Sequence, residues 1–144
     1  MCEYVLSESA VGELCHTLKN KICKGYIVLL RGDLGSGKTT LVRSFVASEN
    51  KQRKEEVTSP TFSLAQAYKS QDYGVIYHYD IYRKDIQDML ELGLLEMFEE
   101  EGLHFVEWGD ERLEKILRQN GFKVMSITIN TNATLDNRIY KVAL

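Results

Sequence analysis

The chain has 144 residues, of which 44% are hydrophobic and 27% are charged, and its formal net charge is −3. This length predicts one domain, residues 1–144, without a separate lid domain. The small negative charge excludes a global positive field that would attract DNA or RNA, and no apolar run has the length of a membrane span. Three cysteines without a C-x-x-C pair favour reduced thiols, so we expect a soluble, cytoplasmic protein.

The first predicted element is an amphipathic helix over residues 7–20. Its apolar side chains recur at the spacing of one helix face: Val11, Leu14, Cys15 and Leu18. Ser7 or Ser9 can cap its first turn. A short polar turn then leads to the apolar run Tyr26–Leu30, which has the length of a buried strand.

The stretch Gly32–Thr39 reads G-D-L-G-S-G-K-T and fits the pattern G-x-x-x-x-G-K-[ST] at every fixed position. We call it the glycine loop. It follows the predicted strand and precedes a predicted helix with one apolar face, formed by Leu41, Val42, Phe45 and Val46. Strand, glycine loop and helix in this order are the context of a phosphate site. The alternative is a glycine-rich turn that only precedes a helix.

In a phosphate site of this kind, the loop amides surround a polyphosphate, and the positive end of the following helix adds to the attraction. We expect Lys38 to reach the β- and γ-phosphates and the Thr39 hydroxyl to bind Mg²⁺. We expect Thr40 to cap the helix or to pack near the site, and assign it no separate role. The candidate nucleotide-binding residues of this stretch are Asp33, Leu34, Gly35, Ser36, Gly37, Lys38, Thr39 and Thr40.

A run of polar residues, Glu49–Glu56, predicts a solvated loop or a frayed helix end. The segment Thr58–Phe62 follows, reads T-S-P-T-F and holds the only proline. Because proline restricts the preceding residue to an extended conformation, we expect a shaped loop that leads into a strand at residues 62–68. Its hydroxyl side chains, Thr61 among them, could contact a γ-phosphate or its magnesium; a polar turn is the equal alternative.

Residues 73–83 predict a second strand, rich in β-branched and aromatic side chains. Alternation places Ile76, His78 and Asp80 on one face of this strand and Tyr77 and Tyr79 on the other. An aspartate at the end of such a strand lies where α/β proteins place ligand chemistry. Asp80 is therefore a candidate site residue.

Residues 84–101 predict an acidic helical stretch that Gly93 divides into two helices. The following segment, Leu103–Trp108, is an apolar strand that ends in a carboxylate. In the second half of a phosphate-binding enzyme, such a strand presents an acid to the metal, so Glu107 could bind Mg²⁺ directly or through water, or orient the attacking water. Trp108, the only tryptophan, could lie against the nucleotide or pack in the core.

The last predicted elements are a helix and a hairpin. Asp110 caps a helix that Asn120 and Gly121 end. Residues 122–130 and 138–144 alternate like two strands, and we expect them to form an antiparallel hairpin at the edge of the sheet.

A glycine loop of this kind also occurs in proteins with three other functions. A GTPase needs a D-x-x-G motif and an N-K-x-D motif, and this sequence has neither. A small-molecule kinase usually carries an arginine-rich lid, whereas the arginines here are scattered. A regulatory module that binds a nucleotide without significant hydrolysis stays open, as does the kinase. Arg43 and Arg83 are candidates for an arginine that approaches the phosphates, and a partner could supply one instead.

Four motifs in this order resemble the TsaE (YjeE) family, the small bacterial ATPase of tRNA threonylcarbamoyladenosine biosynthesis. They are G-D-L-G-S-G-K-T-T at Gly32–Thr40, T-S-P-T-F at Thr58–Phe62, H-Y-D-I-Y-R at His78–Arg83 and E-W-G-D at Glu107–Asp110. The resemblance covers nearly the full length. The chain departs from the family's pattern at the charged run Glu49–Glu56 and by lacking a proline after the E-W motif.

The resemblance implies a three-layer α/β/α fold of the P-loop NTPase type, with a mainly parallel central sheet. It implies binding of ATP or ADP with Mg²⁺ and slow ATP hydrolysis. This hydrolysis supports the TsaB and TsaD proteins, which transfer a threonylcarbamoyl group to the adenosine beside the anticodon of tRNA; tRNA is thus an indirect partner. The resemblance implies that Lys38 and Thr39 bind the phosphates and the metal, and that the Thr58–Phe62 segment is a switch near the γ-phosphate. It also implies that Asp80 and Glu107 are acids around magnesium and that Trp108 lies close to the nucleotide. Of these residues, Lys38, Asp80 and Glu107 are the expected catalytic ones.

Overall fold

The structure is a computed structural model that describes residues 2–49, 56–58, 65–131 and 136–144. Within these residues, eight strands form one sheet in the order β1-β8-β7-β2-β6-β5-β4-β3. The strands are β1 Cys2–Ser7, β2 Tyr26–Arg31, β3 Glu56–Thr58, β4 Ala65–Ser70, β5 Gly74–Asp80, β6 Leu103–Glu107, β7 Lys123–Asn130 and β8 Asn137–Ala143. The helices are the 3₁₀ helix η1 Glu8–Ala10 and the α-helices α1 Val11–Lys19, α2 Lys38–Glu49, α3 Ile86–Glu91, α4 Leu94–Phe98 and α5 Glu111–Gln119.

The sheet is mixed. Its four central strands, β7, β2, β6 and β5, run parallel to one another. At one edge, β8 pairs antiparallel with β7 and with β1; at the other, β4 pairs antiparallel with β5 and with β3. The sheet is therefore mixed and not mainly parallel. The antiparallel pairing of β7 with β8 was predicted, but the edge strand beside this hairpin is β1 and not β8. Since the chain between β4 and β5 is only a short turn, the two strands can pair only antiparallel.

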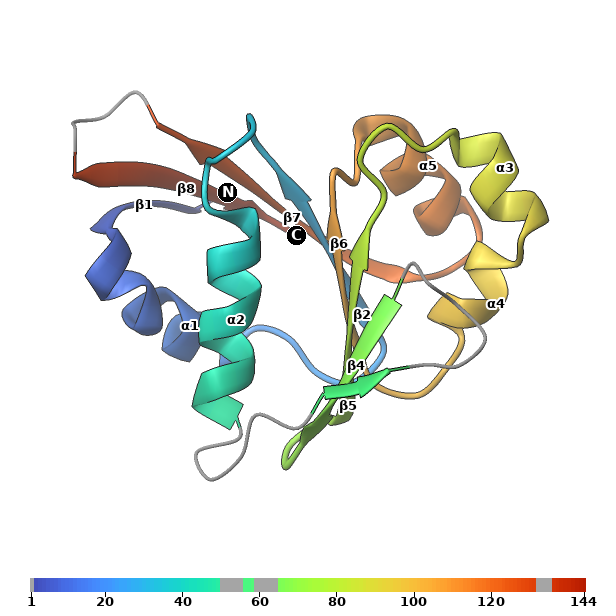
Figure 1. Cartoon of the computed structure of the whole chain (residues 1–144), viewed down its shortest axis with the longest axis horizontal. Coiled ribbons are helices and arrows are strands. Elements are labelled where there is room, and N and C mark those ends of the chain that lie inside the picture. Colours follow the sequence, from blue (N-terminus) through green and yellow to red (C-terminus); the bar gives the residue numbers. More distant parts are fainter. Residues whose placement is uncertain (1, 50–55, 59–64, 132–135) are drawn as a thin grey trace.

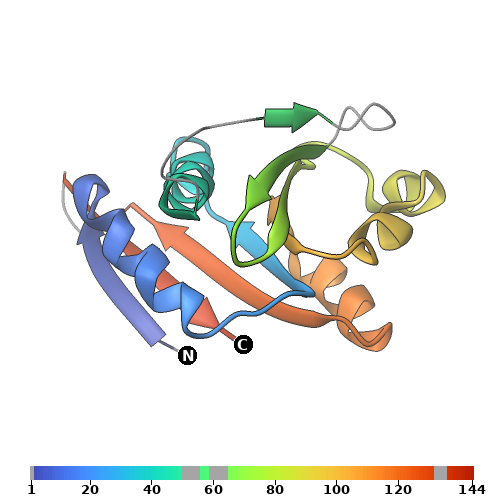
Figure 2. The same cartoon turned by 90° about the horizontal axis from the view of Figure 1, so that it is seen from below.

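Helices cover both faces of the sheet. Figure 1 shows α1 and α2 on one side and α3, α4 and α5 on the other, and Figure 2 shows the same arrangement from below. The central strand β2 is buried on both faces: Val28 and Leu30 belong to the core under α1 and α2, while Ile27 and Leu29 belong to the core under α3–α5. This explains why β2 reads as a continuous apolar run without alternation.

The observed ends of several helices and strands differ from the predicted ones. The 3₁₀ helix η1 precedes α1, so the first residue of α1 is Val11 and its cap is Ala10, which has no side-chain cap. The prediction that Ser7 or Ser9 caps this helix is wrong, because these two hydroxyls hydrogen-bond each other at 3.0 Å. Gly93 divides the acidic stretch into α3 and α4, as predicted.

The other ends differ by a few residues. Strand β5 ends at Asp80, earlier than predicted, because the Asp80 side chain accepts a hydrogen bond from the Tyr82 amide at 3.0 Å and turns the chain. Asp110 caps α5 by accepting a hydrogen bond from the Leu113 amide at 2.9 Å, as predicted. The expected strand at residues 62–68 is β4, whose described part begins at Ala65. None of the helices in the described residues is both long and apolar enough to cross a membrane.

Candidate functional site

The glycine loop joins the carboxyl end of β2 to the N-terminus of α2. Gly32 has a φ of 150°, and a Cβ atom there would lie 2.6 Å from the Ile129 carbonyl oxygen at the end of β7. Only glycine fits this approach. Gly37, the last residue before α2, has a φ of 110°. The loop therefore turns tightly and directs the start of α2 toward the edge where the parallel strands end.

Lys38 is the first residue of α2, and its ammonium group folds back over the loop. Its Nζ donates hydrogen bonds to the carbonyl oxygens of Gly32 at 2.6 Å and Asp33 at 2.9 Å, and to Ser36 Oγ at 3.3 Å. The same Nζ lies 3.8 Å from the centroid of the Trp108 ring. Burial lowers the pKa of Lys38, and nearby carboxylates oppose this shift. The group is thus a cation held in a partly dry setting beside the glycine loop.

Glu107 is the best-connected acid of this region. It lies at the end of β6, is 5% exposed, and accepts hydrogen bonds from the Thr39 hydroxyl at 2.8 and 2.9 Å and from His78 Nε2 at 2.5 Å. Burial acts to raise the pKa of Glu107, but the hydrogen bonds from His78 and Thr39 and the positive charge of Lys38 outweigh it and lower the pKa. Glu107 is therefore a buried carboxylate that stays ionised at neutral pH.

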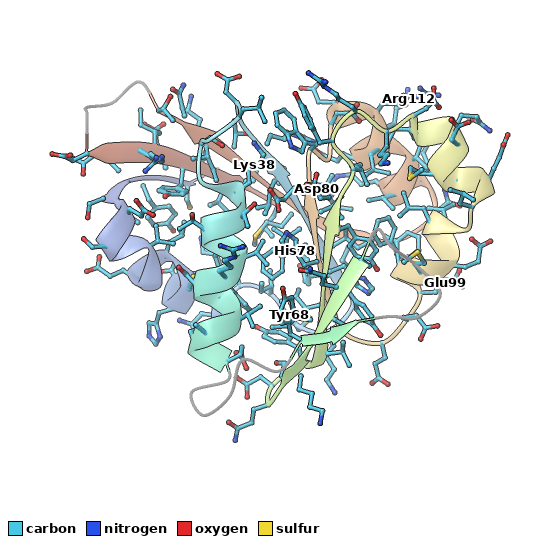
Figure 3. The ribbon with its side chains drawn as sticks, in the orientation of Figure 1. Lys38, Tyr68, His78, Asp80, Glu99 and Arg112 are labelled. Carbon is cyan, nitrogen blue, oxygen red and sulfur yellow. The ribbon has the colours of Figure 1, made fainter. Side chains whose placement is uncertain are left out.

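Asp80 ends the neighbouring strand β5 and is paired in register with Glu107. Figure 3 shows Asp80 at the end of the sheet where Lys38 begins α2, with His78 further down the same strand. The two acids therefore lie side by side because parallel strands end at one edge of the sheet. Asp80 is exposed, whereas Glu107 is buried.

The backbone beside these acids is strained at two residues. Trp108 has a φ of 70° and Arg83 a φ of 58°, and these are the non-glycine residues with positive φ in the described part of the chain. The Trp108 ring packs on the Tyr82 ring at a centroid distance of 4.5 Å, and the Arg83 guanidinium lies 5.0 Å from the Tyr82 ring centroid. Such conformations persist where the surroundings impose them, and they gather at functional sites.

These residues open onto one cavity of about 410 Å³. Its wall comes from three parts of the chain: residues 34–40 of the glycine loop and α2; the strand ends with Asp80, Tyr82, Glu107 and Trp108; and the opposite edge with Glu8, Arg138 and Tyr140. The volume is in the range of small-molecule sites. The side chains of this wall include two cations, Lys38 and Arg138, and three acids, Glu8, Asp80 and Glu107.

The structure brings most of the predicted site residues into this cavity. Asp33 takes part through its carbonyl oxygen, which accepts from Lys38, and does not line the wall. Thr61 and most of the Thr58–Phe62 segment lie outside the described residues. The sequence reasoning assigned no role to His78, Tyr82, Glu8, Arg138 or Tyr140. Of these, His78 could have been found, because alternation puts it on the same face of the strand as Asp80.

An α/β fold with a mixed sheet, carrying a polar cavity where its parallel strands end, defines the class of this protein. The solved structure of YdiB from Bacillus subtilis has the same fold: the TM-score is 0.65, the sequence identity is 23%, and the match covers 99% of this chain and 84% of that chain. The α/β prediction is thereby confirmed.

The chain belongs to the TsaE family: the family model "Threonylcarbamoyl adenosine biosynthesis protein TsaE" matches residues 5–139. Among curated relatives, the tRNA threonylcarbamoyladenosine biosynthesis protein TsaE of Rickettsia conorii is 38% identical over 108 residues, which are 72% of this chain and 58% of the relative. The protein of that name from Bacillus subtilis is 35% identical over 114 residues, 72% of this chain and 68% of the relative. The match thus spans less than two thirds of the Rickettsia protein. The resemblance seen in the sequence motifs is confirmed.

Proposed function

We propose that this chain is the ATP-binding and slowly hydrolysing subunit of tRNA threonylcarbamoyladenosine formation in the cytoplasm, and that it supports threonylcarbamoyl transfer by TsaB and TsaD. The observation that carries the proposal is the contact between Thr39 and Glu107. It joins the end of the glycine loop to the acid-bearing edge of the sheet, so that the loop residues proposed to bind phosphate and the acids line one cavity.

The phosphates of ATP or ADP occupy the glycine loop in this proposal. Residues 34–40, which form the end of the loop and the start of α2, line the same cavity, and the positive N-terminal end of a helix favours anions. Lys38 then exchanges its three neutral oxygen partners for phosphate oxygens. Because an ammonium binds a charged oxygen more strongly than a carbonyl oxygen, the exchange favours the bound state.

Magnesium fits the residues present. Thr39, Glu107 and Asp80 offer oxygen atoms, which this ion prefers. The described residues hold no group of three or more histidine, cysteine, aspartate or glutamate side chains suited to a metal, and magnesium is commonly bound by one or two carboxylates together with substrate phosphates. When bound with the nucleotide, the ion supplies charge neutralisation on the phosphate oxygens.

Hydrolysis needs a group that orients the attacking water. Glu107 is suited to this role because it is ionised and held by His78 and Thr39. Asp80, on the strand next to that of Glu107, carries a second negative charge at this end of the sheet. The Thr58–Phe62 segment stays the predicted sensor of the γ-phosphate, which couples the nucleotide state to the engagement of TsaB and TsaD.

The proposal is tested by calorimetry and turnover measurements. Titration of the chain with ADP and ATP in magnesium buffer measures binding, and phosphate release is followed with and without purified TsaB and TsaD. We expect binding of both nucleotides, slow release from the chain alone and faster release with the partners. Absence of adenine-nucleotide binding would refute the proposal, and binding without release under either condition would replace it with a regulatory module.

A further inference from the structure

Arg31 is the last residue of β2 and directly precedes the glycine loop, but it does not line the cavity described above. Alternation along β2 places it on the face of the sheet that carries Ile27 and Leu29, which lies under α3–α5. On that face it lines a second, open cavity of about 660 Å³ together with residues of α5. An effect of Arg31 on a ligand in the first cavity therefore has to pass through other residues.

The Arg31 side chain holds the two residues that follow β6, Trp108 and Gly109, which we call the β6 turn. Arg31 Nε donates a hydrogen bond to the Gly109 carbonyl oxygen at 2.6 Å. The Trp108 amide donates to the Leu30 carbonyl oxygen at 2.8 Å. The turn lies so close to β2 that a Cβ atom on Gly109 would be 2.6 Å from Leu29 Cδ2. Two neighbouring residues of β2 thus fix two neighbouring residues of the β6 turn.

The β6 turn needs these contacts because its backbone is strained. Trp108 has a φ of 70°, in the left-handed region that a residue with a side chain enters only where its surroundings impose it. Gly109, the next residue, belongs to the residue type with the widest choice of backbone conformations. Without the bond from Arg31, Gly109 would give the chain the freedom to relax the strain at Trp108. The bond removes this freedom.

Helix α5 holds the Arg31 guanidinium in place. Its second nitrogen group donates to Glu114 Oε1 at 2.7 Å, and the other oxygen of Glu114 accepts from Arg118 Nε at 3.0 Å. The side chains of Arg31 and Glu114 are only 21% and 23% exposed. Burial acts to raise the pKa of Glu114, but the hydrogen bonds from the two arginines outweigh it and lower the pKa. An ionised, shielded partner therefore keeps Arg31 at the Gly109 carbonyl.

The β6 turn sets the place of two groups in the first cavity. Lys38 Nζ lies 3.8 Å from the centroid of the Trp108 ring, and the Tyr82 ring packs on the same ring at 4.5 Å. Glu107, which accepts from the Thr39 hydroxyl, directly precedes the turn. A shift of the turn moves the ring beside Lys38 and the backbone that carries Glu107. A displacement of about 1 Å at such groups can lower a rate by about 100-fold.

We infer that Arg31 is a positioning residue: by holding the β6 turn, it keeps the Trp108 ring beside Lys38 and the neighbouring acid in line for hydrolysis. The part that concerns hydrolysis rests on the proposed function and deepens it, whereas the placement of Trp108 is measured without a nucleotide. Because Arg31 does not line the first cavity, its loss should act on the rate of phosphate release. The affinity for ADP should stay close to that of the wild type.

The first measurement is acrylamide quenching of the fluorescence of Trp108, the only tryptophan, in the full chain without nucleotide. Arg31→Met keeps the aliphatic stem and removes the donors, so the ring should become more accessible and its quenching constant should rise. Arg31→Lys can hold Gly109 or Glu114 but lacks the fork that holds both, so its rise should be smaller. Glu114→Gln keeps an acceptor for Arg31, and Arg112→Met removes an exposed arginine of α5; both should match the wild type.

The second measurement is phosphate release from ATP by the same variants in the presence of TsaB and TsaD. We expect Arg31→Met to lower the rate by about 10- to 100-fold, with calorimetry giving an ADP affinity close to the wild type. Urea denaturation identifies a merely structural role. Arg31→Met and Glu114→Gln both weaken the ion pair and lower stability, but only Arg31→Met should change the quenching and the rate.

Wild-type quenching in folded Arg31→Met would overturn the inference, and so would raised quenching with wild-type phosphate release. An equal rise of quenching in Glu114→Gln would assign the effect to the ion pair and overturn it as well. The proposed function survives these three results. No ADP binding and no phosphate release by the wild type would refute the proposed function and the role in hydrolysis, while quenching still decides whether Arg31 places Trp108. If Arg31→Met does not fold, as judged by circular dichroism, the comparison of Arg31→Lys with the wild type decides in the same way.

Discussion

Thr39 donates its hydroxyl to both carboxylate oxygens of Glu107, at 2.8 and 2.9 Å. The contact joins the first turn of α2 to the end of β6. It fixes the acid at the same end of the sheet as the loop amides. The carboxylate therefore has its position before any ligand arrives, which is the condition for an acid that acts on a bound nucleotide.

Glu107→Gln tests this acid. The amide keeps the size of the side chain and can still accept from Thr39, so the fold should persist. We expect phosphate release to fall about 100-fold or more, because a residue that orients or deprotonates water contributes about that much. ADP affinity without magnesium should stay close to the wild type. Glu111→Gln, an exposed carboxylate at the start of α5, is the matched control and should leave turnover unchanged. Wild-type turnover in Glu107→Gln would exclude this acid from the chemistry.

Lys38→Ala removes the ammonium that covers the glycine loop. We expect loss of hydrolysis by about 100-fold or more and weaker nucleotide binding, because one preorganised cationic donor to the phosphates is lost. The fold should survive, since the partners left behind are two carbonyls and a hydroxyl beside solvent-accessible cavity space. Lys115→Ala on the exposed face of α5 is the control. Unchanged turnover in Lys38→Ala would remove the glycine loop from the mechanism.

Trp108 should report on Lys38 directly. It is the only tryptophan, and the Lys38 ammonium lies over its ring at 3.8 Å. If phosphates draw Lys38 away, the cation leaves the ring and the intrinsic fluorescence changes. We expect ADP to change the emission of the wild type, and Lys38→Ala without nucleotide to differ from the wild type in the same direction. If saturating ADP left the tryptophan emission unchanged, this would contradict the exchange of hydrogen-bond partners proposed for Lys38.

The sequence allowed one side of the site to be predicted and not the other. The glycine loop, Lys38 and Thr39 are contiguous, so a local pattern identifies them. The prediction of Asp80 and Glu107 required only one further rule, which is that neighbouring parallel strands end at a common edge of the sheet. Arg138 follows no such rule, because its place depends on β8 pairing back along β7 toward the loop. Local alternation predicts a hairpin there, but not which residue of it faces the cavity.

The same limit applies to the fold. The edge strand β1 was not predicted, since its six residues alternate weakly and all of them are exposed or half-buried. Its existence follows from pairing with β8, a contact between the two ends of the sequence. In contrast, β2 and β6 were predicted well because burial on both faces leaves a continuous apolar run.

Glu49 should contribute to stability rather than to chemistry. It ends α2, its side chain is 1% exposed, and it pairs with Lys19 at 3.1 Å while accepting from the Ser70 hydroxyl and the Asp72 amide. We expect Glu49→Gln to lower the free energy of unfolding by about 1–3 kcal/mol, because Lys19 loses its counter-charge. Urea denaturation measures the change. Glu13→Gln, exposed on α1, should stay within about 0.5 kcal/mol of the wild type, and equal losses in both variants would argue against the ion pair.

His104 is a buried neutral histidine in the core under α3–α5. Its Nε2 lies 2.9 Å from the Glu100 carbonyl oxygen, and its Nδ1 lies 2.8 Å from the Tyr79 hydroxyl. A carbonyl oxygen only accepts, so Nε2 carries the hydrogen and Nδ1 accepts from Tyr79. The ring also stacks on Tyr77 at 4.8 Å. Burial lowers the pKa of His104 to about 4, against an ordinary value of 6.5.

This pKa predicts how stability depends on pH. Between pH 6.5 and about 4 the unfolded chain binds a proton that the folded chain excludes, so the free energy of unfolding falls as the pH is lowered through this window. The full effect is about 3 kcal/mol. We expect His104→Gln, which cannot titrate, to be less stable than the wild type at pH 7.5 but to lose less stability as the pH is lowered. The control variant His16→Gln, at an exposed position of α1, should show the same dependence of unfolding free energy on pH as the wild type. Urea denaturation at pH 7.5, 6, 5 and 4 gives the three slopes. If His104→Gln loses as much stability as the wild type over this range, His104 is not the titrating group.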